Sequence, residues 1–167
     1  ATAGINIQYN EYFIRRPNPL KSMKAHFKVD TNVMVLTLFP GIQQAMVHTL
    51  LHQTGLKAVV LRTFGAGNAP QIPWLKEELT EARRKGIVLV NITQCQAGSV
   101  HMGLYETSLP LLDAGLVSGY DSTPECAITK LMFLLGQGLS AEEIRVKMDS
   151  DIAGEITKPT SEGTAQQ

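Results

Sequence analysis

The sequence predicts a small doubly wound α/β domain, in which helices cover both faces of a parallel sheet of about four strands. Three short apolar runs, over residues 33–39, 58–64 and 87–92, have the length and the β-branched content of buried strands. Two stretches with helical periodicity separate these runs. Strands that alternate with helices at this spacing favour right-handed crossovers, and hence a three-layer fold of Rossmann or flavodoxin type.

The first five elements are bounded by residues that end strands and helices. Pro40 and Gly41 stop the first strand, and Gly55 and Gly86 follow the first and second helices, where a left-handed residue is favoured. In the second helix the apolar side chains recur on one face. The expected elements are a strand over 33–39, a helix over 42–51, a strand over 58–64, a helix over 72–85 and a strand over 87–92.

The pattern after residue 95 is weaker, but it predicts the remaining elements. The run DSTPE (121–125) offers a hydroxyl N-cap, a proline in the first turn and Glu125 in position for a capping box on Ser122. Ser140 and Glu143 repeat the capping box. The expected elements are a loop over 96–103, a short helix over 104–114, a short strand over 116–119, a helix from this cap to 135 and a helix from 140 to 148.

Length and composition favour one domain with no strong charge. We expect a leading segment and linker over 1–32, the α/β domain over 33–150 and a flexible tail over 151–167. Fifteen basic residues balance fifteen acidic ones, so electrostatics favours neither nucleic acid nor an anionic membrane as a partner. No apolar run is long enough to cross a bilayer, and Cys95 and Cys126 suggest free thiols in a reducing compartment. We therefore expect a cytoplasmic protein.

Three segments place small or polar residues where a strand ends or a helix begins, which is where α/β folds bind ligands. They are LRTFGAGNAP (61–70), VNITQC (90–95) and DSTPECAITKL (121–131). With these segments the chain resembles, over about residues 4–155, the C-terminal domain of the cytoplasmic (type I) L-asparaginases, including the mammalian 60 kDa lysophospholipase/asparaginase proteins. The lysophospholipase label has no counterpart in a G-x-S-x-G serine motif here.

The resemblance implies that this domain supports the hydrolysis of L-asparagine without carrying the catalytic residues. In that family the nucleophilic threonine and its Thr-Asp-Lys group lie in a larger N-terminal domain, and the reaction needs no cofactor. This domain would supply the interface of a homodimer or homotetramer, and Asn68 and Tyr105 would complete a substrate pocket. The positions that match Arg62, Thr93 and Cys95 line an allosteric asparagine site, where the arginine holds the α-carboxylate.

The residues themselves leave alternatives open. An arginine in an apolar strand needs a partner, and an internal salt bridge would serve Arg62 as well as a ligand would. A stand-alone module that binds a small ligand without catalysis also fits this architecture.

Other motifs have plainer explanations than the chemistry they suggest. Gly65 and Gly67 resemble part of a dinucleotide fingerprint, but the third glycine is missing, and a tight turn with Asn68 near a helix N-cap explains them. His48 and His52 have the i, i+4 spacing of zinc ligands, but no third ligand is evident nearby, so we expect no metal site.

Four further side chains have equally plain explanations. His101 has no evident ligand partner, and Cys95 has no assigned base that would activate its thiol. Asp121 and Glu125, four residues apart, are explained by helix capping rather than by acid/base catalysis.

Overall fold

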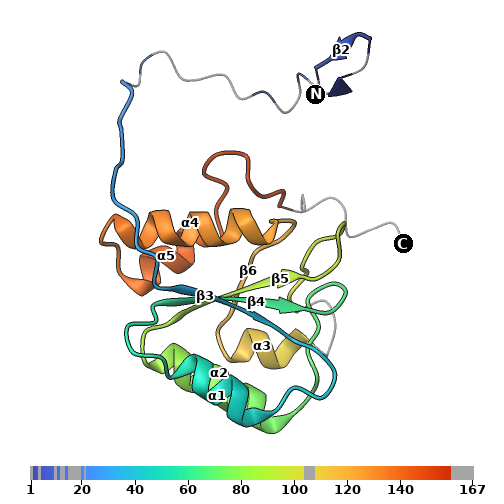
Figure 1. Ribbon diagram of the computed structural model, residues 1–167, viewed down its shortest axis with the longest axis vertical. Helices are drawn as coiled ribbons and strands as arrows, with labels where there is room; N and C mark the ends of the chain where they lie inside the picture. Colours follow the sequence, from blue (N-terminus) through green and yellow to red (C-terminus); the bar gives the residue numbers. More distant parts are fainter. Residues whose placement is uncertain are drawn as a thin grey trace.

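The computed structural model describes residues 22–103 and 108–158, with short pieces of the leading segment at 2–3, 5–9, 11, 14 and 20. Its centre is a four-stranded parallel sheet in the order β3-β4-β5-β6 (Figure 1). The strands are β3 (Val33–Thr37), β4 (Ala58–Thr63), β5 (Val88–Thr93) and β6 (Val117–Ser118). A separate antiparallel pair, β1 (Thr2–Ala3) and β2 (Ile7–Gln8), lies in the leading segment. The predicted α/β class and parallel sheet are confirmed.

Helices cover both faces of this sheet, so the domain has three layers (Figure 1). One face carries α1 (Gln44–Leu51), α2 (Pro73–Arg84) and α3 (Leu109–Asp113), and the other carries α4 (Pro124–Gly136) and α5 (Ala141–Met148). The strands follow one another in sequence order, so α1, α2 and α3 all connect neighbouring strands on the same face. Among the described residues, the helices that cover the second face are the two that follow the last strand.

The buried residues of each strand alternate between two apolar cores. In β4, Val59 and Leu61 belong to the core beneath α1 and α2, whereas Ala58 and Val60 belong to the core beneath α4 and α5. The parallel register pairs Leu61 with Asn91 and continues to the last residues of β4 and β5. This alternation decides which polar side chains share a face where the strands end.

The start of α4 differs from the sequence-based expectation. Thr123 is the N-cap, and its hydroxyl accepts a hydrogen bond from the backbone N–H of Cys126 at 3.2 Å. Glu125 is then the second helical residue, one position short of that needed for a capping box, so the expected box on Ser122 is wrong. Two adjacent hydroxyl residues made the N-cap ambiguous in the sequence.

The start of α5 is as predicted. Ser140 is the N-cap, and its hydroxyl accepts a hydrogen bond from the backbone N–H of Glu143 at 3.3 Å. The carboxylate of Glu143 in turn accepts one from the backbone N–H of Ser140 at 2.8 Å. The capping box is therefore confirmed.

The segment before β3 is attached along α4. The N–H of Asp30 donates to the carbonyl of Met132 at 2.9 Å, and the side-chain amide of Gln137 donates to the carbonyl of Lys28 at 3.0 Å. A β-carbon on Gly136 would lie 2.6 Å from the backbone of Val29, so glycine permits this close approach. Residues 28–30 thus share the packing of the domain.

Candidate functional site

The candidate site lies at the carboxyl edge of the sheet, where a tight turn follows β4. Phe64 and Asn68 close this turn through paired backbone hydrogen bonds of 2.9 and 2.8 Å. Gly67 has φ +103°, and a β-carbon there would lie 2.7 Å from the side chain of Val100, so only glycine fits. Asn68 is thereby presented at the edge, four residues before Ile72, which is the N-cap of α2. The expected tight turn is present, and Asn68 is not itself the N-cap of the helix.

Two buried polar side chains of β5 form hydrogen bonds with the backbone of this turn. The amide of Asn91 donates to the carbonyl of Gly67 at 3.1 Å and accepts from the hydroxyl of Thr63 at 2.7 Å. The hydroxyl of Thr93 donates to the carbonyl of Gly65 at 2.6 Å. The two bonds of Asn91 are buried and the bond of Thr93 is partly buried, so the position of the turn is fixed by β5.

Gln94 ties the ends of two strands together at the same edge. Its side-chain amide donates to the carbonyls of Leu38 at 2.7 Å and Arg62 at 2.9 Å. We predicted roles for neither Gln94 nor Asn91 from the sequence. A buried asparagine in an apolar strand was the available signal, because such a side chain must find hydrogen-bond partners.

Arg62 has no carboxylate partner in the part of the chain that the structure describes. It forms no ion pair there, and its Nε atom is buried without a hydrogen-bond partner. The alternative of an internal salt bridge therefore has no support among residues 22–103 and 108–158. A buried guanidinium nitrogen without a partner is costly, and an anionic ligand would relieve that cost.

The structure brings only some of the predicted site residues together. Thr93 and Cys95 are in contact, because the N–H of Cys95 donates to the hydroxyl of Thr93 at 3.0 Å. Arg62 pairs in register with Ile92 on the face of α4 and α5, whereas Thr93 pairs with Thr63 on the opposite face. The Thr93 hydroxyl also donates its proton to the carbonyl of Gly65, so it has no second proton to donate to a ligand. Tyr105 lies outside the described residues.

A pocket of about 370 Å³ lies beside the turn, between the start of α2 and α3. Most of its lining is apolar, as at Ile72 and Leu111. Its charged residues, Lys76 and Asp113, pair with each other at 2.8 Å. No unpaired charge in this lining would bind an amino acid, so the pocket is a poorer candidate than the edge around Arg62 and Asn68.

One group of possible metal ligands lies away from this edge. His48 of α1 is 3.0 Å from the carboxylate of Glu78, which comes from α2. The sequence spacing did not reveal Glu78, because it lies 30 residues further along the chain. His101 makes a backbone hydrogen bond to Ala66 at 3.0 Å.

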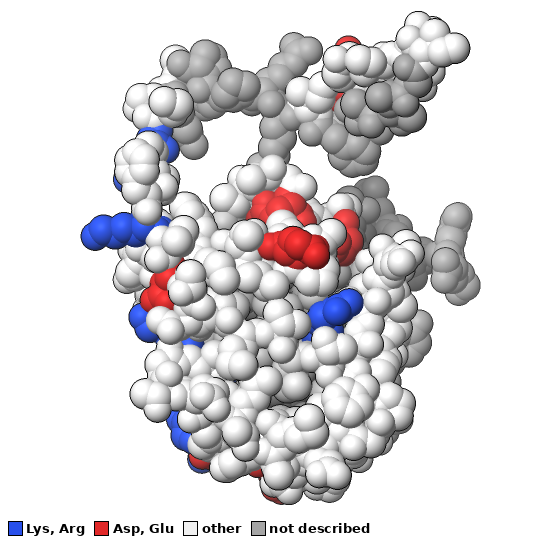
Figure 2. All heavy atoms as spheres, in the orientation of Figure 1, with Lys and Arg blue, Asp and Glu red and all other residues white. Residues whose placement is uncertain are grey.

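The surface has no dominant charge on the face shown in Figure 2. Lysine and arginine side chains are separated there by uncharged surface, and acidic groups lie among them. This distribution agrees with the balanced composition. Among the described residues, no helix combines the length and the hydropathy that a membrane span requires.

Comparisons with known proteins agree on one family. Residues 32–148 match the family described as Glutaminase/Asparaginase C-terminal domain. The chain is 39% identical to the 60 kDa lysophospholipase of Homo sapiens over 97% of this chain and 28% of that protein. It is 46% identical to L-asparaginase 1 of Escherichia coli K12 over 74% of this chain and 36% of that protein.

The chain is also similar to a solved structure. L-asparaginase I from Vibrio cholerae superposes with a TM-score of 0.86 and is 42% identical over 93% of this chain and 47% of that one. The chain therefore spans less than half of the length of these relatives. The match includes the sheet and both helical layers, so the chain belongs to the Glutaminase/Asparaginase C-terminal domain family.

Proposed function

We propose that the chain is the C-terminal domain of an L-asparaginase, which hydrolyses L-asparagine to L-aspartate and ammonia. The observation that carries this proposal is the turn that presents Asn68 at the carboxyl edge of a domain of this family. The nucleophilic threonine and its activating groups would come from an N-terminal domain, since the chain covers only 28 to 47% of the length of these relatives. The free thiols of Cys95 and Cys126 favour a cytoplasmic location.

Within such an enzyme, Asn68 would complete a substrate pocket in a homodimer or homotetramer. The turn is held by Asn91 and Thr93, so the side chain on it has a fixed base. Fixed positioning of a substrate-binding group lowers the entropy cost of reaching the transition state. Tyr105 would act with Asn68.

The isolated chain should hydrolyse asparagine no faster than a blank, because the attacking hydroxyl and its base belong to the other domain. Release of ammonia or aspartate by the purified chain is the measurement. Clear turnover that a substitution within these 167 residues abolishes would contradict the proposal. A stand-alone binding module would also fail to hydrolyse asparagine. Replacing the corresponding domain of a complete asparaginase with this chain distinguishes a binding module from an asparaginase domain.

We infer further that Arg62 binds the α-carboxylate of an effector asparagine at the sheet edge. Its buried Nε atom without a partner and the absence of an ion pair within the described residues support this role. A planar guanidinium grips a carboxylate with two parallel hydrogen bonds, which a lysine cannot reproduce. Cys95 would border the effector, and Thr93 would act mainly by holding the turn.

In an asparaginase that carries this domain, Arg62→Lys should abolish sigmoidal dependence on asparagine concentration. The maximal rate should change less than about twofold, because Arg62 would not contact the reacting atoms. Initial rates over a wide asparagine range test this. Retained cooperativity in the variant, or a hyperbolic curve for the unsubstituted enzyme, would assign Arg62 a structural role instead.

A further inference from the structure

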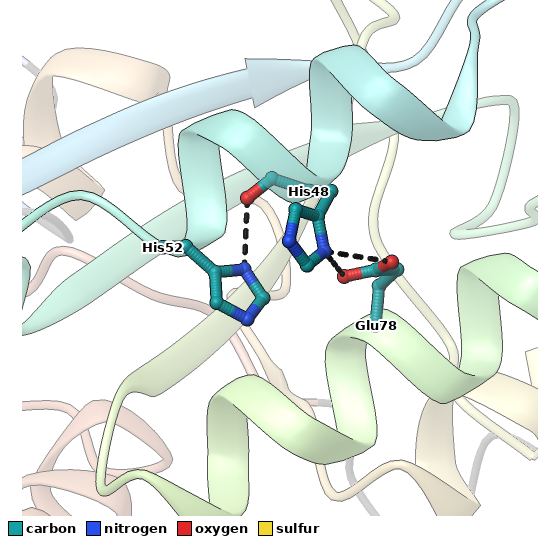
Figure 3. A group of neighbouring side chains, drawn as sticks. All are labelled: His48, His52 and Glu78. Atoms are coloured by element: carbon teal, nitrogen blue, oxygen red, sulfur yellow. Dashed lines mark hydrogen bonds and ion pairs between the residues drawn. The ribbon is translucent and has the colours of Figure 1, made fainter.

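Two histidines and a carboxylate form a cluster between α1 and α2, separate from the candidate site (Figure 3). His48 lies in the last turn of α1, His52 is the C-cap of this helix, and Glu78 faces them from α2. One ligand atom from each residue lies within 4.8 Å of the others. Because α1 runs back from the carboxyl edge, its last turn lies toward the opposite edge of the sheet. No residue of the cluster takes part in the proposed function.

Glu78 is a buried carboxylate with little counter-charge. Its side chain is 6% exposed, and within the described residues its one ion-pair partner is His48, at 3.0 Å. The amide of Gln44 adds a hydrogen bond of 3.0 Å but no charge. No lysine or arginine pairs with this carboxylate among the described residues. A cation bound beside it would supply the missing charge.

His52 has the hydrogen bond that prepares a histidine for a metal. Its Nδ1 lies 2.8 Å from the backbone carbonyl of His48 (Figure 3). A carbonyl can only accept, so Nδ1 carries the proton, and Nε2, which lies 3.3 Å from a carboxylate oxygen of Glu81, is the nitrogen that would exchange this contact for a metal. Histidines that bind metals commonly donate their other N–H to a backbone carbonyl in this way.

To close around an ion, the site needs a side-chain adjustment and the loss of the proton that His48 Nδ1 shares with Glu78. His48 Nδ1 and Glu78 Oε2 are 3.0 Å apart. Two ligands of a tetrahedral zinc ion are separated by about 3.4 Å when each is ~2.1 Å from the metal. The two imidazole rings are stacked at 3.8 Å, and the His48 side chain is 54% exposed, so rotation of a ring can bring the third atom to the same point.

We propose that His48, His52 and Glu78 bind one divalent transition-metal ion of the zinc class and so join α1 to α2. Two imidazole nitrogens and a carboxylate oxygen are a ligand set that suits zinc, with water as the fourth ligand. Glu81 approaches His52 at 3.3 Å but is paired with Lys85 at 2.8 Å, which leaves the fourth position to water. The ion would stabilise the helical layer independently of asparagine.

The test is a titration of the chelator-treated full chain with Zn²⁺ against a chromophoric competitor. We expect one ion per chain, with affinity at least about tenfold weaker in His52→Gln and Glu78→Gln. The matched controls His26→Gln, His101→Gln and Cys95→Ser should change the affinity less than twofold. Circular dichroism verifies that each variant is folded, and Glu78→Gln keeps the shape of the side chain.

A second measurement does not depend on the variants. Co²⁺ added to the unsubstituted chain should give the visible absorption of a tetrahedral site without a thiolate charge-transfer band, and Zn²⁺ should raise the melting temperature. The proposal is overturned if no one-to-one binding occurs at micromolar protein, if a thiolate band appears, or if a control variant and not the cluster variants removes binding.

Discussion

Asn91 and Thr93 determine where Asn68 lies, although neither is presented to solvent. Both side chains are buried at the end of β5, and together they accept or donate hydrogen bonds to the turn and to the strand beside it. The glycines of the turn permit its tight backbone conformation, but they have no side chains that could hold the turn in position. The precision of the site therefore comes from the neighbouring strand.

Thr93→Val should lower the free energy of unfolding by about 2 kcal/mol. The change keeps the size of the side chain but leaves the carbonyl of Gly65 and the N–H of Cys95 without their partner. Urea denaturation is the measurement. As a matched control, Thr129→Val on the exposed side of α4 should cost less than about 1 kcal/mol, because water replaces its bond to the helix. Equal losses in the two variants would contradict this account.

At this scale the sequence predicted residue types better than contacts. The segment with Arg62 and Asn68 was recognised because strand ends in α/β folds are ligand sites. The faces that Arg62 and Thr93 occupy depend on strand register. The observed register places the two side chains on opposite faces of the sheet, so they do not converge as the resemblance implied. Glu78 and Gln94 could not be connected to their partners because tertiary packing alone brings those segments together.

The segment after α5 behaves as an attached element. Residues 151–158 belong to the expected flexible tail, yet Glu155 forms a buried ion pair with Lys130 at 2.6 Å. The ammonium of Lys130 also donates to the carbonyl of Ser150 at 2.6 Å. A polar, pattern-free stretch gave no sign of this, because the partner is a single lysine within the apolar sequence of α4.

The ion pair should make stability depend on pH. Burial raises the pKa of Glu155, but the hydrogen bonds from Lys130 and from the N–H groups of Ile152 and Ala153 outweigh it and lower the pKa from 4.5 to about 2. A carboxyl with a lower pKa in the folded state adds stability that is fully present above 4.5 and is lost as the pH falls toward 2. The contribution at neutral pH is up to about 3 kcal/mol.

Glu155→Gln should therefore lower the free energy of unfolding most at neutral pH, and the deficit should shrink below pH 4.5. Urea denaturation across this pH range measures it. Glu142→Gln is the control, because the Glu142 side chain is 76% exposed and should have little effect at any pH. A deficit that stays constant as the pH falls would mean that Glu155 acts through packing rather than charge.

Elements were predicted more reliably than their ends. Strands and helices follow from local periodicity, so the predicted strands at 33–39, 58–64 and 87–92 each overlap an observed strand. The start of α4 was misplaced by one residue because Ser122 and Thr123 are both good N-caps. The anchoring of the leading segment on α4 could not be foreseen, since it rests on the absence of a side chain at Gly136.

At the scale of the whole molecule, we propose that this domain serves an asparaginase and completes its active site. Two apolar cores on either side of one sheet give it a rigid body, and its polar site lies at one edge of that sheet. Such a domain has no need of its own nucleophile if a neighbouring domain supplies it. Its contribution is geometric, so it must be measured within a complete enzyme.

The most direct measurement replaces the C-terminal domain of Vibrio cholerae L-asparaginase I with this chain and records asparagine hydrolysis. The account predicts that the hybrid is active and that Asn68→Ala lowers kcat/KM by about tenfold or more without lowering its melting temperature. The N-terminal part expressed alone is the control and should be inactive. A hybrid that folds and assembles like the bacterial enzyme but hydrolyses no asparagine, or whose kcat/KM is unaffected by Asn68→Ala, would contradict the account.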